Sequence, residues 1–69
     1  MTQHGILLAR AQALSDPANV DHLTVALCDV ALGRQLDAPT LAALEPDDRW
    51  RLTWMTAGEA RDELDRRAR

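Results

Sequence analysis

The sequence predicts an all-α fold, a small bundle of three to four helices formed by residues 1–69 as a single domain. Eleven leucines and twelve alanines stand against only four valine or isoleucine residues, and phenylalanine and tyrosine are absent. Strands favour the residue types that are scarce here. Three prolines follow acidic residues closely, at places where a helix can begin. The chain also lacks an alternating strand pattern and a two-residue hairpin signal.

The first helix is expected over residues 3 to 14. Leu7, Ala11 and Leu14 recur at helical spacing and predict the stripe that faces the core, with Ile6 and Leu8 widening it.

The second helix is expected over residues 17 to 35, because Asp16-Pro17 has the form of an N-cap followed by a first turn. Apolar residues occupy almost its whole circumference, and only a narrow strip with His22 and Asp29 suits water. A helix that is apolar on nearly all sides is usually the central, buried one. We therefore expect this helix to form the middle of the domain.

A short helix is expected over residues 39 to 44, followed by a long one from residue 46 to about residue 67. The long segment has a near-heptad stripe, interrupted by Arg61, that consists of Trp50, Trp54, Ala57, Leu64 and Ala68. Its polar side has acid-before-arginine pairs at i,i+4, which stabilise a helix: Glu45/Arg49, Asp47/Arg51, Asp62/Arg66, Glu63/Arg67 and Asp65/Arg69.

An alternative for this last segment stays open. Thr56-Ala57-Gly58-Glu59 has the form of a capping box, which marks the start of a new helix. The segment would then be two helices, over about 46–55 and 57–67. We favour the continuous helix.

The charge and the single cysteine narrow the class of protein. The formal net charge is −3 and all eight basic residues are arginines. One cysteine forms no internal disulfide, which fits a reducing compartment. The start lacks the basic and apolar regions of a signal peptide, and no apolar run approaches the ~18 residues of a membrane span. We expect a cytoplasmic protein with no membrane association, from a GC-rich bacterial or phage genome.

The chain predicts no catalytic residue, so we expect a protein that is not an enzyme. His22 and Cys28 lie six residues apart in one predicted helix, which turns them about 120° away from each other. The phosphate-binding, dinucleotide and nucleophile-elbow motifs are missing. His4, His22 and Cys28 match no zinc spacing. We therefore expect no metal and no cofactor, and we interpret Cys28 as a small buried apolar residue.

Residues 25 to 44 could form a helix–turn–helix with Gly33 in the turn. The Pro39-Thr40-Leu41 start resembles the x-P-T-L opening of many bacterial recognition helices. The second helix, however, offers no Arg, Lys, Asn or Gln to read a base edge. The acidic total charge also disfavours nucleic acid as a partner. A dimeric helix–turn–helix DNA-binding regulator is therefore the alternative function.

The favoured function is that of a small protein–protein interaction module, acting as a regulator, adaptor or inhibitor. A domain of this size draws little stability from its own core, so a second copy or another protein is the expected partner. The helix over residues 17 to 35 and the stripe that contains Trp50 and Trp54 are the expected apolar surfaces for a homodimer. The tryptophans are either core residues or partner contacts, and both interpretations stay open. The predicted contact residues are Trp50, Trp54, Arg61 and Leu64.

Overall fold

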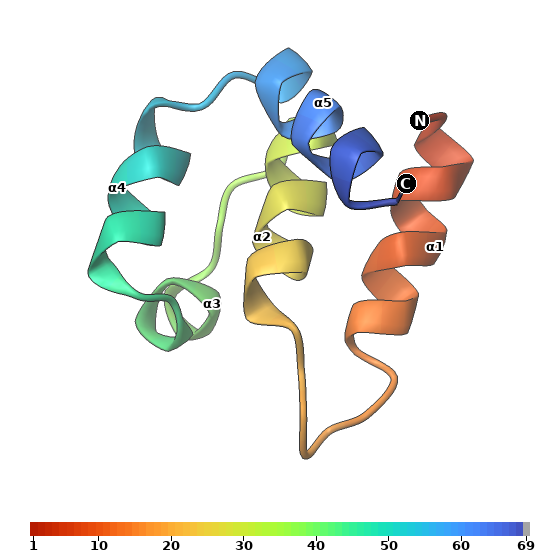
Figure 1. Ribbon diagram of the computed structural model, residues 1–69. Helices are drawn as coiled ribbons and strands as arrows, with labels where there is room; N and C mark the ends of the chain where they lie inside the picture. The colour runs from red at the N-terminus through yellow and green to blue at the C-terminus, as the bar shows by residue number, and fades with distance from the viewer. Residues whose placement is uncertain (69) are drawn as a thin grey trace.

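The computed structural model describes residues 1–68, which contain five helices and no strand (Figure 1). The helices are α1 (Gln3–Ala13), α2 (His22–Ala31), α3 (Ala38–Ala43), α4 (Pro46–Trp54) and α5 (Ala57–Arg67). The all-α prediction is confirmed, and the number of helices exceeds the expected three to four. The expectation for residue 69, including the Asp65/Arg69 pair, lies outside the described residues.

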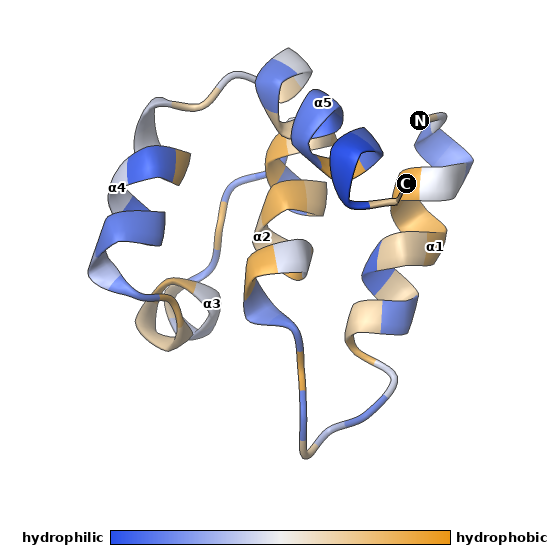
Figure 2. Ribbon diagram, viewed as in Figure 1, coloured by the Kyte–Doolittle hydropathy of each residue, from blue (hydrophilic) through white to orange (hydrophobic). Residues whose placement is uncertain are grey.

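Helix α2 occupies the centre, and each of the other four helices packs against it. Figure 2 shows the concentration of apolar residues along α2, whereas α4 and α5 are mostly hydrophilic. The core consists of Ile6, Ala26, Leu27, Cys28, Ala31, Leu44, Leu52, Ala60 and Leu64. The prediction of a central, buried second helix is confirmed, and so is the burial of Cys28.

Helix α2 begins later than residue 17, which the Asp16-Pro17 pattern predicted. The Asp16 carboxylate accepts the Ala18 N–H at 3.0 Å, and its carbonyl accepts the Asn19 N–H at 3.0 Å. These bonds form a turn, in which Pro is as favourable as at a helix start. Asp21 is the actual N-cap, because its carboxylate accepts the Thr24 N–H at 3.1 Å.

Helix α2 also ends earlier than residue 35. Gly33 has a φ of 74°, the left-handed conformation that glycine adopts most easily. Its N–H donates to the Val30 carbonyl at 3.1 Å, and the Arg34 N–H donates to the Asp29 carbonyl at 2.8 Å. This pair of bonds is a Schellman motif, which ends a helix and satisfies its last carbonyl groups.

The last segment forms two helices, so the favoured continuous helix over residues 46–67 is wrong. Met55 and Thr56 both have extended backbone conformations. The Thr56 hydroxyl accepts the Glu59 N–H at 3.1 Å, and the Glu59 carboxylate accepts the Thr56 N–H at 3.0 Å. The alternative with two helices is confirmed because this capping box is fully formed and begins α5.

Helix α1 has nearly its predicted length but is rotated about its own axis, so that a different face packs against the core. Ile6 is fully buried, whereas Leu7, Leu8 and Leu14 are among the exposed large hydrophobic residues. The predicted core stripe of Leu7, Ala11 and Leu14 is therefore wrong. Helix α1 instead turns Ile6, Ala9 and Arg10 toward the core.

An ion pair between Arg10 and a buried carboxylate accounts for this rotation. The Arg10 Nε donates to Asp29 Oδ1 of α2 at 2.8 Å. Asp29 was expected to face water but is 6% exposed. A buried carboxylate is costly without a partner, so α1 must present Arg10 to α2.

Candidate protein-binding surface

Two tryptophans form an exposed aromatic pair on α4. Trp50 is 67% exposed and Trp54 is 69% exposed, the highest values among the exposed large hydrophobic residues of the described chain. Their rings contact each other edge to face, with centroids 5.8 Å apart and an interplanar angle of 71°. This arrangement is a favourable one for two aromatic rings. We call Trp50 and Trp54 together the tryptophan pair, and their interpretation as core residues is wrong.

The position of Leu52 explains why the tryptophan pair faces outward. Leu52 is buried against α2 and lies two residues from each tryptophan. At 100° per residue, each tryptophan lies about 160° around α4 from Leu52. Met55 also packs against the core. Helix α4 therefore uses Leu52 and Met55 for attachment, and the pair projects from the far side.

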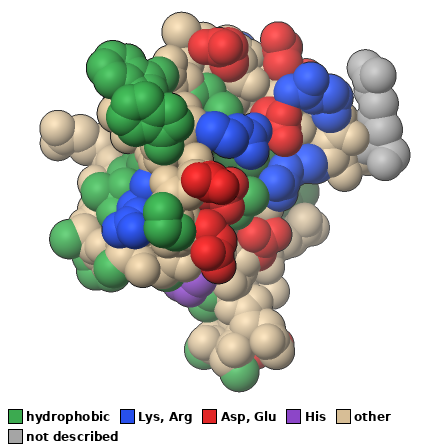
Figure 3. Space-filling view, turned by 60° about the vertical axis from the view of Figure 1, so that its left-hand side comes forward, with side chains coloured by type: hydrophobic (Ala, Val, Ile, Leu, Met, Phe, Trp, Pro, Cys, Tyr) green, Lys and Arg blue, Asp and Glu red, His purple; other side chains and the backbone are tan. Residues whose placement is uncertain are grey.

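Hydrophobic side chains project beside charged ones on this side of the molecule (Figure 3). A contiguous exposed apolar patch is a typical feature of protein–protein interaction sites. A central aromatic contact with a charged rim is the usual composition of a protein–protein interface.

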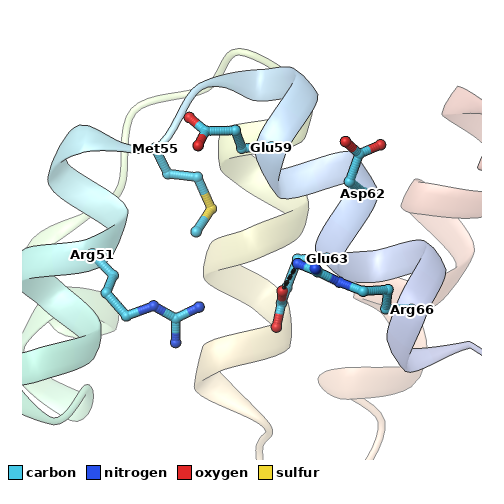
Figure 4. Close-up of a pocket in the computed structure, with 6 residues that line it drawn as sticks. All are labelled: Arg51, Met55, Glu59, Asp62, Glu63 and Arg66. Carbon is cyan, nitrogen blue, oxygen red and sulfur yellow. Dashed lines mark hydrogen bonds and ion pairs between the residues drawn. The ribbon is translucent and has the colours of Figure 1, made fainter.

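A charged cleft of about 460 Å³ lies between α4 and α5 (Figure 4). It is lined by Arg51, Met55, Glu59, Asp62, Glu63 and Arg66. Arg51 lies one helical turn before Trp54, so the cleft and the pair share an edge of α4. The Arg51 Nη1 lies 3.7 Å from Asp48 Oδ1.

The cleft has charges of both signs, and its α5 wall already contains an ion pair between Glu63 and Arg66. Arg66 donates to the Glu63 carboxylate, and this bond holds the pKa of Glu63 below its usual range. Arg67 also approaches Glu63, with the Nε atom 3.7 Å from the second carboxylate oxygen. The cleft therefore supplies a mixed polar rim to the tryptophan pair rather than a strong site for either an anion or a cation.

The structure does not gather the four predicted contact residues into one surface. Leu64 is 2% exposed and belongs to the core, so its assignment to the contact surface is wrong. Arg61 is exposed but lies one turn before Asp65, whose Oδ1 is 2.8 Å from the amino nitrogen of Met1. Arg61 thus lies on the α5 edge toward α1, whereas the charged cleft lies on the α4 edge.

Sequence reasoning missed Arg51 and Met55 as neighbours of the tryptophan pair. In one continuous helix, residues on either side of residue 56 share a single stripe. Such a helix leaves no cleft between two helices for Arg51 and Met55 to line. The capping-box pattern at Thr56 and Glu59 was the signal that could have revealed the cleft between two helices.

The cysteine and the two histidines lie in different environments. Cys28 is fully buried, and burial raises the pKa of its thiol, which disfavours the reactive thiolate. His4 is exposed at the start of α1, and His22 is half-buried at the start of α2. Within residues 1–68, no three His, Cys, Asp or Glu side chains gather in a way that could hold a metal ion.

Comparison with known proteins found no match to a family model, to a curated protein or to a solved structure. Among the helices of residues 1–68, none combines the length and apolar character needed to cross a lipid bilayer.

Proposed function

We propose that this chain is a non-enzymatic protein–protein interaction module that binds a partner protein through the tryptophan pair. The observation that carries the proposal is the exposure of Trp50 and Trp54 as a preformed edge-to-face pair. Tryptophan is among the residues most enriched at interface positions that dominate binding energy. The biological role that follows is that of a small regulator, adaptor or inhibitor in the cytoplasm.

The geometry of the pair favours binding for a second reason. The two rings already contact each other, so little side-chain freedom remains to be lost on association. Each buried tryptophan removes roughly 150–250 Å² from water. The partner's complementary surface would be an apolar pocket with polar groups around it, because Arg51 of the charged cleft lies one helical turn from Trp54.

DNA recognition by residues 25–44 gains no support. Helix α3 exposes Ala38, Pro39, Ala42 and Ala43, none of which has a side chain that can form a hydrogen bond with a base edge. We therefore advance partner binding alone.

The test begins with affinity capture from a GC-rich bacterial lysate and continues with the purified partner. Three forms are compared: the parent, the double variant Trp50→Ala/Trp54→Ala, and Arg61→Ala. Arg61 is the matched control because it is exposed on the opposite edge of α5. We expect the double variant to bind the purified partner at least about 30-fold more weakly, a loss of about 2 kcal/mol. Arg61→Ala should bind as the parent does.

The intrinsic fluorescence gives an independent readout, since the chain has only these two tryptophans and no tyrosine. Binding should shift the emission to shorter wavelength as the rings leave water. Equal affinity of the parent and the double variant, or an unchanged emission on saturation, would contradict the proposal. If the parent and Arg61→Ala self-associate but the double variant does not, the tryptophan pair is instead the interface of a homodimer.

A further inference from the structure

A second apolar surface lies on α1. Leu7, Leu8 and Leu14 are 39%, 52% and 41% exposed, and Ala11 between them is exposed as well. Leu7, Ala11 and Leu14 follow the 4-3 spacing that places residues along one side of a helix, with Leu8 beside them. We call these four residues the α1 leucine face. It accounts for three of the five exposed large hydrophobic residues in the described chain.

The α1 leucine face has no charge. Arg10 is the only charged side chain between residues 2 and 15, and its Nε is bound to Asp29 on the inner side of α1. The polar residues around the face are Gln3, His4, Gln12 and Ser15. A partner that presented charges here would bury them without counterparts, which is costly. The occupant that fits is itself apolar and uncharged along one helix.

We infer that a second copy of this chain packs its own α1 against the α1 leucine face. A two-fold pair places the same surface on both chains, so the surface must complement itself. An uncharged face meets this condition because no like charges oppose each other. Alternating large and small residues, as in Leu7, Ala11 and Leu14, also allow the leucines of one helix to pack over the alanine of the other.

The size of the face sets the strength of the association. Helix α1 has 11 residues and is therefore about 16 Å long. A contact between two such helices falls in the class of interfaces below about 1,200 Å², which are weak and reversible. The dimer should therefore form with rising protein concentration rather than persist at high dilution.

This inference is separate from the proposed function. Helices α1 and α4 lie at opposite edges of the molecule, with α2 and α5 between them (Figure 1). Pairing through α1 therefore leaves the tryptophan pair of each copy free. The dimer would present two partner-binding surfaces, which increases the apparent affinity for a partner with two sites.

The test is sedimentation equilibrium of the full chain between about 10 µM and about 1 mM, the range that a contact of this size requires. The variant Leu7→Glu/Leu14→Glu places charges on the face without touching the core. Ala42→Glu/Ala43→Glu adds the same charge at exposed positions of α3 and is the matched control. Leu8→Glu, at the most exposed leucine, is a second variant with one substitution. Circular dichroism confirms that every variant remains helical.

We expect the parent and the α3 control to dimerise alike, and the two leucine variants to raise the dimer dissociation constant at least about 10-fold. Trp50→Ala/Trp54→Ala should dimerise as the parent does. A parent that stays monomeric over the whole range would overturn the inference, as would leucine variants that still dimerise normally. Loss of the dimer in the tryptophan variant would overturn it too, and would leave partner binding to be judged by its own experiment.

Discussion

Arg10 and Asp29 join α1 to the central helix through a charge-assisted hydrogen bond of 2.8 Å. Asp29 is buried among apolar residues of α2, and Arg10 remains partly exposed at the edge of the contact. The pair sets the rotation of α1 about its axis, because only one orientation brings Arg10 to Asp29. That orientation directs Leu7, Leu8 and Leu14 outward, so the ion pair also creates the α1 leucine face.

The variant Arg10→Met should lower the free energy of unfolding by about 1–3 kcal/mol, because it leaves a buried carboxylate without its charged partner. The double variant Arg10→Met/Asp29→Leu should recover most of this loss, since apolar residues can replace a buried ion pair. Urea denaturation followed by circular dichroism measures both. If Arg10→Met were as stable as the parent, the pair would not hold α1 in place.

Truncation on the two sides of α4 should lower stability strongly on the buried side and hardly at all on the exposed side. Leu52→Ala removes a buried side chain and should lower the free energy of unfolding by about 2–4 kcal/mol. Trp54→Ala, at a position 69% exposed, should change it by less than about 0.5 kcal/mol. Thermal denaturation compares them, and acrylamide quenching of the parent should show both tryptophans accessible to solvent. A large loss of stability in Trp54→Ala would contradict the exposed position of the ring.

The two substitutions Gly33→Ala and Gly58→Ala should differ in sign. Gly33 has a φ of 74°, so alanine there should cost about 1–2 kcal/mol from backbone strain although no atom lies within 4 Å. Gly58 lies in the first turn of α5, where an added Cβ would meet only the Thr56 Oγ1 at 3.9 Å. Alanine there should stabilise by up to about 1 kcal/mol through helix propensity. Denaturant unfolding of the two single variants measures the difference, and equal effects would contradict the left-handed helix end.

Three acidic side chains at helix starts predict loss of stability in acid. Hydrogen bonds from Thr24 lower the pKa of Asp21 below 3.8, bonds from Thr40 lower that of Asp37 below 3.8, and the Thr56 N–H lowers that of Glu59 below 4.5. A carboxyl group with a lowered folded-state pKa stabilises the fold above its ordinary pKa. That contribution is lost as the pH falls through the folded-state pKa.

The free energy of unfolding should therefore decline below a pH of about 4.5, and most steeply below about 4. The variant Asp21→Asn/Asp37→Asn keeps side chains that cap helices well but do not titrate. It should show a shallower decline than the parent when both are measured by urea unfolding across this range. Equal slopes for the two proteins would show that the caps do not carry the acid sensitivity.

The composition and the periodicity of the sequence were sufficient to predict the broad features of the fold. The scarcity of β-branched and aromatic residues predicted helices, and the apolar circumference of residues 17–35 predicted that the second helix is central. These features depend on composition and on local periodicity, which act through each residue's own preferences. The capping box at Thr56 and Glu59 is also local, and it was visible as an alternative before the structure resolved it.

The candidate site was predicted only in part. Trp50 and Trp54 were named as contact residues, but so was Leu64, which lies in the core. Their shared stripe existed only if residues 46–67 formed one helix. In the structure one helix ends at Trp54 and another begins at Ala57. The contacts of α4 with α2 and those of α5 with α2 therefore set the orientations of these two helices independently.

By itself, the sequence determined that this protein is a small helical domain with an apolar second helix and charged final helices. Only the tertiary structure decided which of two apolar faces α1 and α4 turn inward. On α1 the choice lay between Ile6 and the neighbouring leucines, and on α4 between Leu52 and the tryptophans. On each helix, either face could turn inward without any change in the helical conformation. The packing around α2 and the requirement to pair Asp29 with Arg10 select one of them, and the faces left outside are the surfaces available for binding.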